Sequence, residues 1–181
     1  MVGHPSSSRT PEVVLAGGYA RAEAMGIVLR PMTDADMGFL SALYASTREE
    51  ELSQLPWDAA QKRDFLEMQF HAQHAHYQAH YPDAAWLVVE HGNQPAGRLY
   101  IEEWPSELRI IDIALMPAFR GRGLGAALLR DIMEKAETVR KAVGIHVEKA
   151  NPAMRLYHRL GFRTIEDKGV YDLLRWSRVG A

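Results

Sequence analysis

The stretch from residue 108 to residue 140 constrains the fold more than any other part of the chain. Residues 108–115 form an apolar run interrupted by Asp112, which is typical of a central strand. Residues 123–140 repeat apolar side chains at helical spacing, and three glycines stand in five positions around the start of this second segment, at 121, 123 and 125. A strand, a glycine-rich loop and an amphipathic helix in this order predict a domain in which helices pack on a sheet.

The rest of the chain extends this pattern into one mixed α+β domain. Strands are expected at 27–30, 85–89, 97–101, 145–148, 162–165 and 170–176, and further helices after 33, over 58–81 and after 151. The strands at 85–89 and 97–101 flank a Gly-Asn pair, which is a hairpin signal. The chain has no internal repeat and no long linker, so we expect a single domain over 27–176.

The two ends of the chain are expected to lie outside this domain. Residues 1–26 are rich in serine, proline and glycine and carry only a short apolar patch, so they predict a loosely structured extension. Met25 is compatible with a native start, and a segment that docks on the domain is equally compatible with the sequence. Residues 177–181 are expected to form a short tail.

Composition excludes several classes of function. The chain has 181 residues, with 21 Lys and Arg against 23 Asp and Glu, a formal charge of -2 that favours neither nucleic acid nor a membrane surface. No apolar run approaches the roughly 20 residues of a membrane span. The chain has no cysteine, which excludes disulfides, thiolate metal ligands and a cysteine nucleophile and fits a cytoplasmic location.

The glycine-rich loop predicts an anion site. Glycines let the backbone approach a ligand closely, and the following helix directs its positive N-terminal end at the same place, which suits a phosphate or pyrophosphate. Arg120 and Arg122 would add positive charge there.

Two classes of phosphate-containing cofactor compete for this loop. Gly121, Gly123 and Ala126 satisfy a dinucleotide-binding fingerprint, and Glu148 ends the next expected strand, where a ribose-binding acid would stand. Residues 116–120, however, separate the first glycine from the strand. A dinucleotide unit that begins this late would also leave too little chain for a substrate domain, so we disfavour it.

The same segment, with the one that follows it, resembles the GNAT superfamily of acyl-CoA-dependent N-acyltransferases. Residues 113–129, with the pattern Arg120-x-x-Gly123-x-Gly125, resemble the family's fourth strand, pyrophosphate loop and third helix, and residues 147–162 resemble its fifth strand and fourth helix. The resemblance implies a mostly antiparallel sheet of six to seven strands flanked by about four helices, with a V-shaped splay between the fourth and fifth strands. It also implies transfer of an acetyl group from acetyl-CoA to a primary amine of a small molecule or peptide, by direct attack in a ternary complex.

The resemblance also assigns site residues. Backbone groups of Ile113, Ala114 and Leu115 would bind the thioester carbonyl and the pantetheine arm, and Tyr157 would protonate the leaving thiolate as general acid. The other expected acetyl-CoA contacts are made by the loop and by the start of the last helix, at Arg120, Gly121, Arg122, Gly123, Leu124, Gly125, Ala126 and Asn151. Asn151 stands one residue nearer to Tyr157 than is usual in the family.

Two residues are equally matched candidates for the general base. His146 lies on the fifth strand, where related enzymes carry a catalytic acid, and a neutral imidazole accepts a proton near pH 7. Asp112 interrupts an apolar strand, so it either faces the cleft or has a buried partner.

Three further expectations complete the interpretation. His71 and His74 point to the opposite side of their helix from His76 and His80, so no metal site is expected. A catalytically degenerate, CoA-binding regulatory or interaction module is the alternative to an enzyme. The amine acceptor stays open, and a homodimer is compatible with the sequence.

Overall fold

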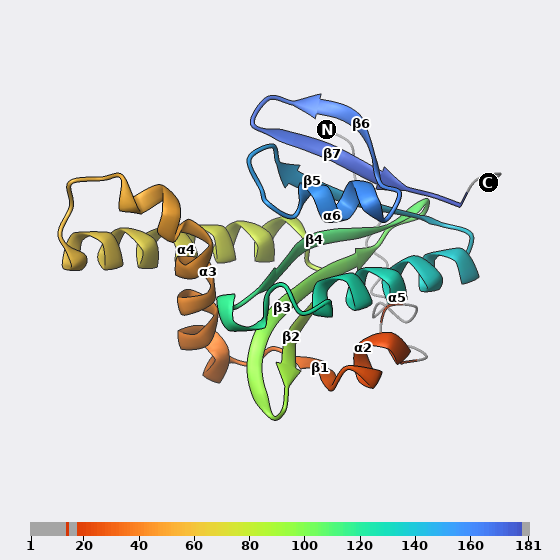
Figure 1. Cartoon of the computed structure of the whole chain (residues 1–181), viewed down its shortest axis with the longest axis horizontal. Coiled ribbons are helices and arrows are strands. Elements are labelled where there is room, and N and C mark those ends of the chain that lie inside the picture. Colours follow the sequence, from red (N-terminus) through yellow and green to blue (C-terminus); the bar gives the residue numbers. More distant parts are fainter. Residues whose placement is uncertain (1–13, 15–17, 179–181) are drawn as a thin grey trace.

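A seven-stranded sheet organises the chain in the computed structural model, which describes Val14 and residues 18–178 (Figure 1). The strands are β1 (Ile27–Pro31), β2 (Ala85–His91), β3 (Gln94–Glu103), β4 (Glu107–Leu115), β5 (Ala142–Glu148), β6 (Arg163–Lys168) and β7 (Tyr171–Trp176). Their spatial order is β1-β2-β3-β4-β5-β7-β6, and every neighbouring pair is antiparallel except β4 and β5. The expected mixed, mostly antiparallel sheet is confirmed.

The expected splay lies between β4 and β5. The two strands pair only from Glu107 to Ile110 on β4 and from Ala142 to Ile145 on β5, whereas β4 stays paired with β3 as far as Leu115. The register between β3 and β4 shifts at Ile111, where β4 has one extra residue. Such a bulge bends a strand, so the second half of β4 leaves β5 and opens a V in the sheet.

Helices cover both faces of the sheet. The helix α5 (Leu124–Thr138) joins β4 to β5 and buries its apolar stripe against one face, together with α6 (Met154–Arg159). On the opposite face, α3 (Met37–Ser53) and α4 (Ala59–His80) form a second cluster around Leu40 and Phe70. Alternation along β4 explains the division, because Ile113 and Leu115 contact the first cluster and Ala114 the second.

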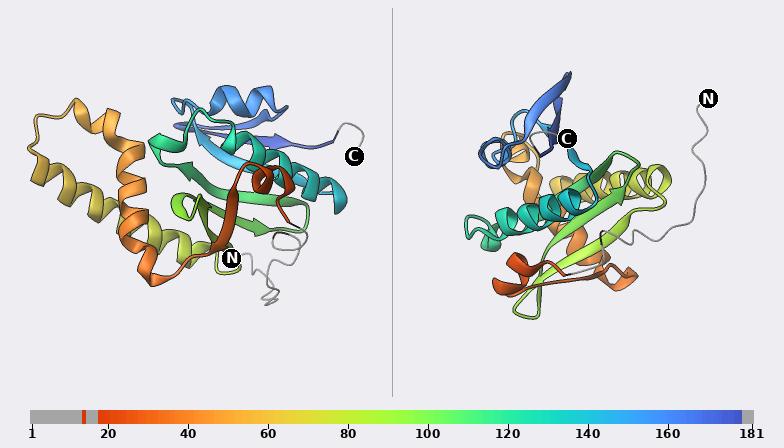
Figure 2. Two further views of the ribbon diagram at one scale, coloured as in Figure 1. Left: turned by 60° about the horizontal axis from the view of Figure 1, so that its bottom comes forward. Right: turned by 90° about the vertical axis from the view of Figure 1, so that its right-hand side faces the viewer.

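Part of the N-terminal segment is folded and docks on α5 (Figure 2). The additional helix α2 (Ala20–Ala24) packs beside α5, and Tyr19 and Ala22 belong to the main core. Asp131 on α5 binds the start of α2, since its carboxylate accepts hydrogen bonds from the backbone amides of Arg21 and Ala22 at 3.2 and 2.9 Å. The expectation of a loose extension is therefore wrong for residues 18–26, and most of residues 1–17 lie outside the described part of the chain.

The other elements follow the sequence closely. The helix expected over 58–81 is α4, which Asp58 caps through the amide of Gln61, and Gly92 and Asn93 form the two-residue hairpin turn with φ of 60° and 61°. β5 begins at Ala142, three residues earlier than expected. No helix in residues 18–178 combines the length and apolarity that a membrane crossing requires.

Candidate active site

The splay exposes backbone amides of β4. Met116 N donates to Ala96 O at 2.8 Å, so alternation directs the amide of Ala114 toward β3 as well. The amides of Ile113 and Leu115 then point to the other side, where β5 has departed. Two of the three expected backbone residues thus present donors to the V, and Ala114 does not.

The loop after β4 has the form of an anion cradle. Gly121 and Gly123 have φ of 70° and 83°, a left-handed conformation that side chains with a Cβ rarely adopt, and Gly123 is the N-cap of α5. A Cβ built on Gly121 would meet no other atom within 4 Å, so the loop surface around Gly121 is open. The geometry fits a pyrophosphate, which backbone amides and the positive end of α5 would bind together.

The two arginines of the loop have different environments. Arg120 Nε donates to Leu115 O at 2.7 Å and its Nη2 donates to Ser46 Oγ at 3.1 Å, so this side chain ties the loop to the end of β4 and to α3. The guanidinium of Arg122 lies 5.8 Å from the centroid of the Phe119 ring and has no ion pair among the described residues. Arg122 is therefore the residue that is better placed to add charge to the loop.

Tyr157 on α6 lies in the main core with 4% of its surface exposed, and its ring packs edge-on against Phe162 at 5.5 Å. None of the hydrogen bonds among the described residues uses its hydroxyl. Burial raises the pKa of Tyr157, and the negative charge of Asp112 raises it further. The phenol is therefore protonated at neutral pH and has a proton to donate.

Asn151 has a local structural role. Its Oδ1 accepts a hydrogen bond from the amide of Ala153 at 2.8 Å, just before α6 begins, and the side chain is exposed. Asn151 thus helps to start the helix that carries Tyr157.

Asp112 has the buried partner that its position in an apolar strand required. Its Oδ2 accepts hydrogen bonds from Arg98 Nη2 at 2.7 Å and from the Tyr77 hydroxyl at 3.2 Å. Arg98 is only 3% exposed and also donates to Gln73 at 2.9 Å. The carboxylate is therefore part of a buried polar network between β3, β4 and α4, and its Oδ1 makes no hydrogen bond to any described residue.

His146 faces the same side of the sheet but is bound by an arginine. Arg109 Nη1 lies 3.1 Å from His146 Nδ1, and because a guanidinium only donates, Nδ1 accepts and the neutral ring carries its proton on Nε2. Burial lowers the pKa of His146, and the positive charges of Arg109 and Lys168 lower it further. In this arrangement the imidazole presents a donor to its surroundings.

A cavity of about 440 Å³ opens beside His146, and we call it the acceptor-side cavity. It lies between α4, the paired part of β4 and β5, and the β6–β7 hairpin. The polar side chains that matter most in its wall are those of Tyr77, Arg109, His146, Lys168 and Tyr171. Because Ile110 and Ile111 also line it, the cavity reaches the point where β4 and β5 separate.

Most of these polar residues were not among the sites predicted from the sequence. Arg98 and Arg109 occupy buried strand positions, so the criterion that singled out Asp112 in an apolar strand would also have found them. Lys168 and Tyr171 flank a hairpin turn, where charged and aromatic residues are common, and no sequence signal distinguishes them.

The structure disfavours the dinucleotide alternative. A dinucleotide-binding unit belongs to a mostly parallel sheet, whereas only β4 and β5 are parallel in this one, and the short helix η2 (Pro117–Phe119) separates β4 from the loop. Glu148 is bound by Arg48 of α3 at 2.9 Å and by the Tyr171 hydroxyl at 3.2 Å. Among the described residues, no group of three or more histidines or acids is arranged to hold a metal ion.

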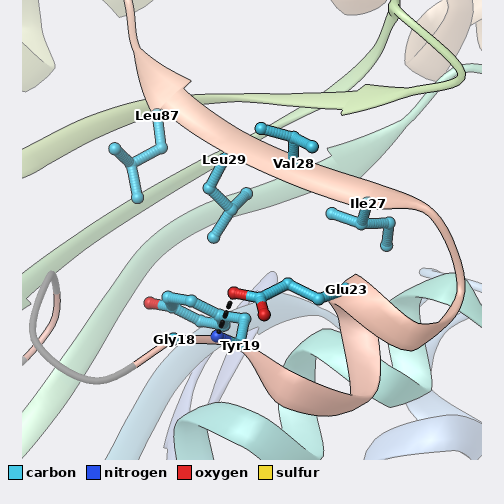
Figure 3. Close-up of a pocket in the computed structure, with 7 residues that line it drawn as sticks. All are labelled: Gly18, Tyr19, Glu23, Ile27, Val28, Leu29 and Leu87. Carbon is cyan, nitrogen blue, oxygen red and sulfur yellow. Dashed lines mark hydrogen bonds between the residues drawn. The ribbon is translucent and has the colours of Figure 1, made fainter.

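A second cavity, of about 260 Å³, lies between α2 and β1, on the far edge of the sheet from the splay (Figure 3). Its walls are mainly apolar, with Ile27, Leu29 and Leu87 on one side. The carboxylate of Glu23 in this cavity already accepts the amide of Tyr19 at 3.0 Å. This cavity therefore offers mainly apolar contacts.

Solved structures of acetyltransferases have the same fold. The paiA N-acetyltransferase of Thermoplasma acidophilum, solved in complex with coenzyme A, has a TM-score of 0.65 at 12% identity, covering 85% of this chain and 100% of that one. YncA of Salmonella typhimurium, a putative acetyltransferase solved with acetyl-CoA, has a TM-score of 0.53 at 20% identity, with coverage of 84% and 94%. At these identities the likeness establishes the fold.

Sequence relatives agree with the fold. A mycothiol acetyltransferase of Corynebacterium glutamicum is 34% identical over 96 residues, which are 51% of this chain and 32% of that protein. The chain thus covers about a third of the length of this curated relative. Residues 44–162 match the sequence profile of the Acetyltransferase (GNAT) family. Since that match spans well over half of the chain and includes the splayed strands, the glycine-rich loop and Tyr157, the chain belongs to the Acetyltransferase (GNAT) family.

Proposed function

We propose that the chain is an N-acetyltransferase that transfers an acetyl group from acetyl-CoA to a primary amine by direct attack in a ternary complex. The observation that carries the proposal is the splay itself: two outward-facing amides of β4 lie between a glycine cradle at the start of α5 and the cavity on the α4 side. A donor bound along one side of the V would thus meet an acceptor entering from the other.

The donor would be held mainly by backbone. The amides of Ile113 and Leu115 are free to bind the acetyl carbonyl and the pantetheine arm, and preorganised amides stabilise the negative charge that develops on that oxygen. Gly121, Gly123 and the first turn of α5 would hold the pyrophosphate, with Arg122 adding positive charge.

Acetyl transfer forms an N–C bond and breaks the C–S bond of the thioester, so one proton leaves the amine and one is needed by the thiolate. Tyr157 supplies the second, because its hydroxyl is protonated and free of other hydrogen bonds among the described residues. His146 is not available to accept the proton that leaves the amine, because its Nδ1 already accepts a hydrogen bond from Arg109. We therefore assign the first proton to water, which passes it to Oδ1 of Asp112, a carboxylate oxygen that makes no hydrogen bond to any described residue.

Two measurements test the proposal. Coenzyme A, and not NAD, should raise the melting temperature at matched concentration, since a ligand that binds only the native state stabilises it. Thiol release from acetyl-CoA with a panel of amines, against an amine-free control, then separates an enzyme from a degenerate CoA-binding module. Stabilisation by coenzyme A without amine-dependent thiol release would favour the module, and stabilisation by NAD alone would overturn both.

A further inference from the structure

The charges around the acceptor-side cavity are unbalanced. Its charged wall residues are Arg109 and Lys168, accompanied by the imidazoles of His76 and His146, and no Asp or Glu is among the described residues that line it. An acceptor that enters this cavity therefore meets cations and hydroxyl groups first.

The carboxylates behind the wall are already neutralised. Glu107, about 2% exposed, receives bonds from both Arg109 and Arg175, so one negative charge is shared by two guanidinium groups. Asp112 is paired with Arg98 at 2.7 Å. Glu166 pairs with Lys168 at 2.6 Å on the exposed hairpin, and Glu148 pairs with Arg48 at 2.9 Å. The group of Glu107, Arg109 and Arg175 keeps one net positive charge, which agrees with the lowered pKa of His146.

The two wall cations differ in mobility, and together they suit one kind of ligand. Arg109 is fixed in place, because its Nε donates a hydrogen bond to Glu107 and its guanidinium stacks over the Trp104 ring at 4.4 Å from the centroid. Lys168 also lines the cavity, with 46% of its side chain exposed and a flexible stem. A fixed guanidinium and an adaptable ammonium group in the wall of one cavity suit a carboxylate or phosphate, whereas the Tyr77 and Tyr171 hydroxyls already donate to Asp112 and Glu148.

The same charges oppose a polycationic acceptor and favour the reactive form of an amine. A second ammonium group on the substrate would be repelled by the net positive charge of the group formed by Glu107, Arg109 and Arg175, while the charge of Lys168 is partly offset by Glu166. Positive surroundings also lower the pKa of a bound amine, which increases the fraction of the neutral nucleophile.

We infer that the acceptor is an amine that also carries an anionic group, a carboxylate or a phosphate, which Arg109 and Lys168 bind while the amine points into the splay. This inference rests on the proposed function and adds the substrate class.

Matched pairs of amines test the inference. Thiol release is measured with 4-aminobutyrate against 4-aminobutanamide, with glucosamine 6-phosphate against glucosamine, and with spermidine as the polycation. We expect the anionic member of at least one pair to exceed its neutral partner in kcat/KM by roughly 10-fold, the gain of one charged hydrogen bond. The pair that shows the difference distinguishes a carboxylate from a phosphate.

Lys168→Ala then locates the effect, with Lys149→Ala as a matched control. Lys149 is 43% exposed and ion-paired with Asp167 and Asp172 in the same hairpin region, but it does not line the cavity. We expect Lys168→Ala to raise KM for the anionic acceptor about 5- to 10-fold, to leave KM for the neutral partner unchanged, and Lys149→Ala to change neither.

The outcomes separate the two proposals. Equal or better turnover of the neutral amines or of spermidine, or an unchanged KM in Lys168→Ala, would overturn the inference and leave the N-acetyltransferase intact. Thiol release with none of the five amines, in a protein that coenzyme A stabilises, would overturn the proposed function and the inference with it.

Discussion

The two halves of the candidate site are built from different parts of the polypeptide. The donor half consists of backbone: amides of Ile113 and Leu115, the positive-φ glycines of the loop and the first turn of α5. The acceptor half consists of side chains from α4, β4, β5 and the β6–β7 hairpin, held by buried ion pairs such as Arg98–Asp112. A backbone site demands particular residues at fixed spacing in one segment, whereas a side-chain site is assembled from segments far apart, so only the first is visible as a motif.

The largest effect should come from placing a side chain in the donor half. Gly123→Asp adds a carboxylate where pyrophosphate would approach and where φ is 83°, so we expect coenzyme A affinity to fall by about 100-fold or more. Isothermal titration of the purified variant measures this loss.

Gly169→Asp is the matched control, since Gly169 has φ of 82° in the β6–β7 turn and a Cβ there meets no atom within 4 Å. Both variants carry similar backbone strain, but only the first should lose coenzyme A. Equal affinities in the two variants would mean that the phosphates bind elsewhere.

Tyr157→Phe tests chemistry at the boundary between the halves. The ring and its contact with Phe162 are kept and the proton donor is lost, so we expect kcat to fall by about 10²-fold while acetyl-CoA affinity changes little. The thiolate also leaves without full protonation, because a thiol has a pKa of about 8.5, and this limits the size of the effect.

Tyr19→Phe removes a buried hydroxyl far from the splay, whose partner is Val14 O at 3.1 Å, and should leave kcat unchanged. Wild-type turnover in Tyr157→Phe, with chemistry shown to be rate-limiting, would end the general-acid assignment.

A smaller effect is expected behind the donor half, where Asp131 ties α2 to α5. Asp131→Ala leaves two backbone amides of α2 without their acceptor, so we expect the free energy of unfolding to fall by about 2 kcal/mol. Urea unfolding measures this change, and coenzyme A affinity of the folded variant should stay within about 3-fold, since Asp131 lies in the middle of α5, seven residues after Leu124 at its start. Glu134→Ala removes an exposed partner of the same Arg21 and should cost less than about 1 kcal/mol. Equal losses in both variants would contradict the capping role of Asp131.

The smallest effect concerns the loss of stability at acid pH, which we assign to His74 and His146 on the acceptor side of the sheet. Burial lowers the pKa of His74 and of His146, and the nearby arginines Arg98 and Arg109 lower it further. Above a pH of about 6.5, the ordinary histidine pKa, these two side chains are neutral in both the folded and the unfolded chain. Below that pH the unfolded chain binds protons first, so the free energy of unfolding should decrease as pH falls from 7 to 5. Replacing both histidines with glutamine should flatten this dependence in urea titrations. The exposed His71 on the same helix as His74 is the control, and an equal change in His71→Gln would show that His74 and His146 are not the cause.

Local chemistry explains which parts of the fold were predictable. Alternation and helical spacing located every strand and four of the five α-helices in residues 18–178, because nearly all of those segments have one face in the core. The exception is β6, whose six residues are all exposed. The fifth, α2, lacked such a signal: it has five residues, and its stability comes from Asp131, more than 100 positions away in sequence. A short helix that depends on a distant carboxylate cannot be predicted from its own residues.

The sequence alone predicted an anion-binding loop from the spacing of Gly121, Gly123 and Gly125 between a strand and a helix, because backbone conformation depends on local residue type, and the resemblance to the GNAT family assigned that loop to acetyl-CoA. The tertiary structure decided the surroundings of the two candidate bases. Asp112 and His146 looked equivalent in sequence, yet the fold places Arg98 against one and Arg109 against the other. The reason is physical: the charge and hydrogen-bonding state of a side chain depend on which groups the fold brings within a few ångströms, and those groups come from strands and helices that the sequence does not place side by side.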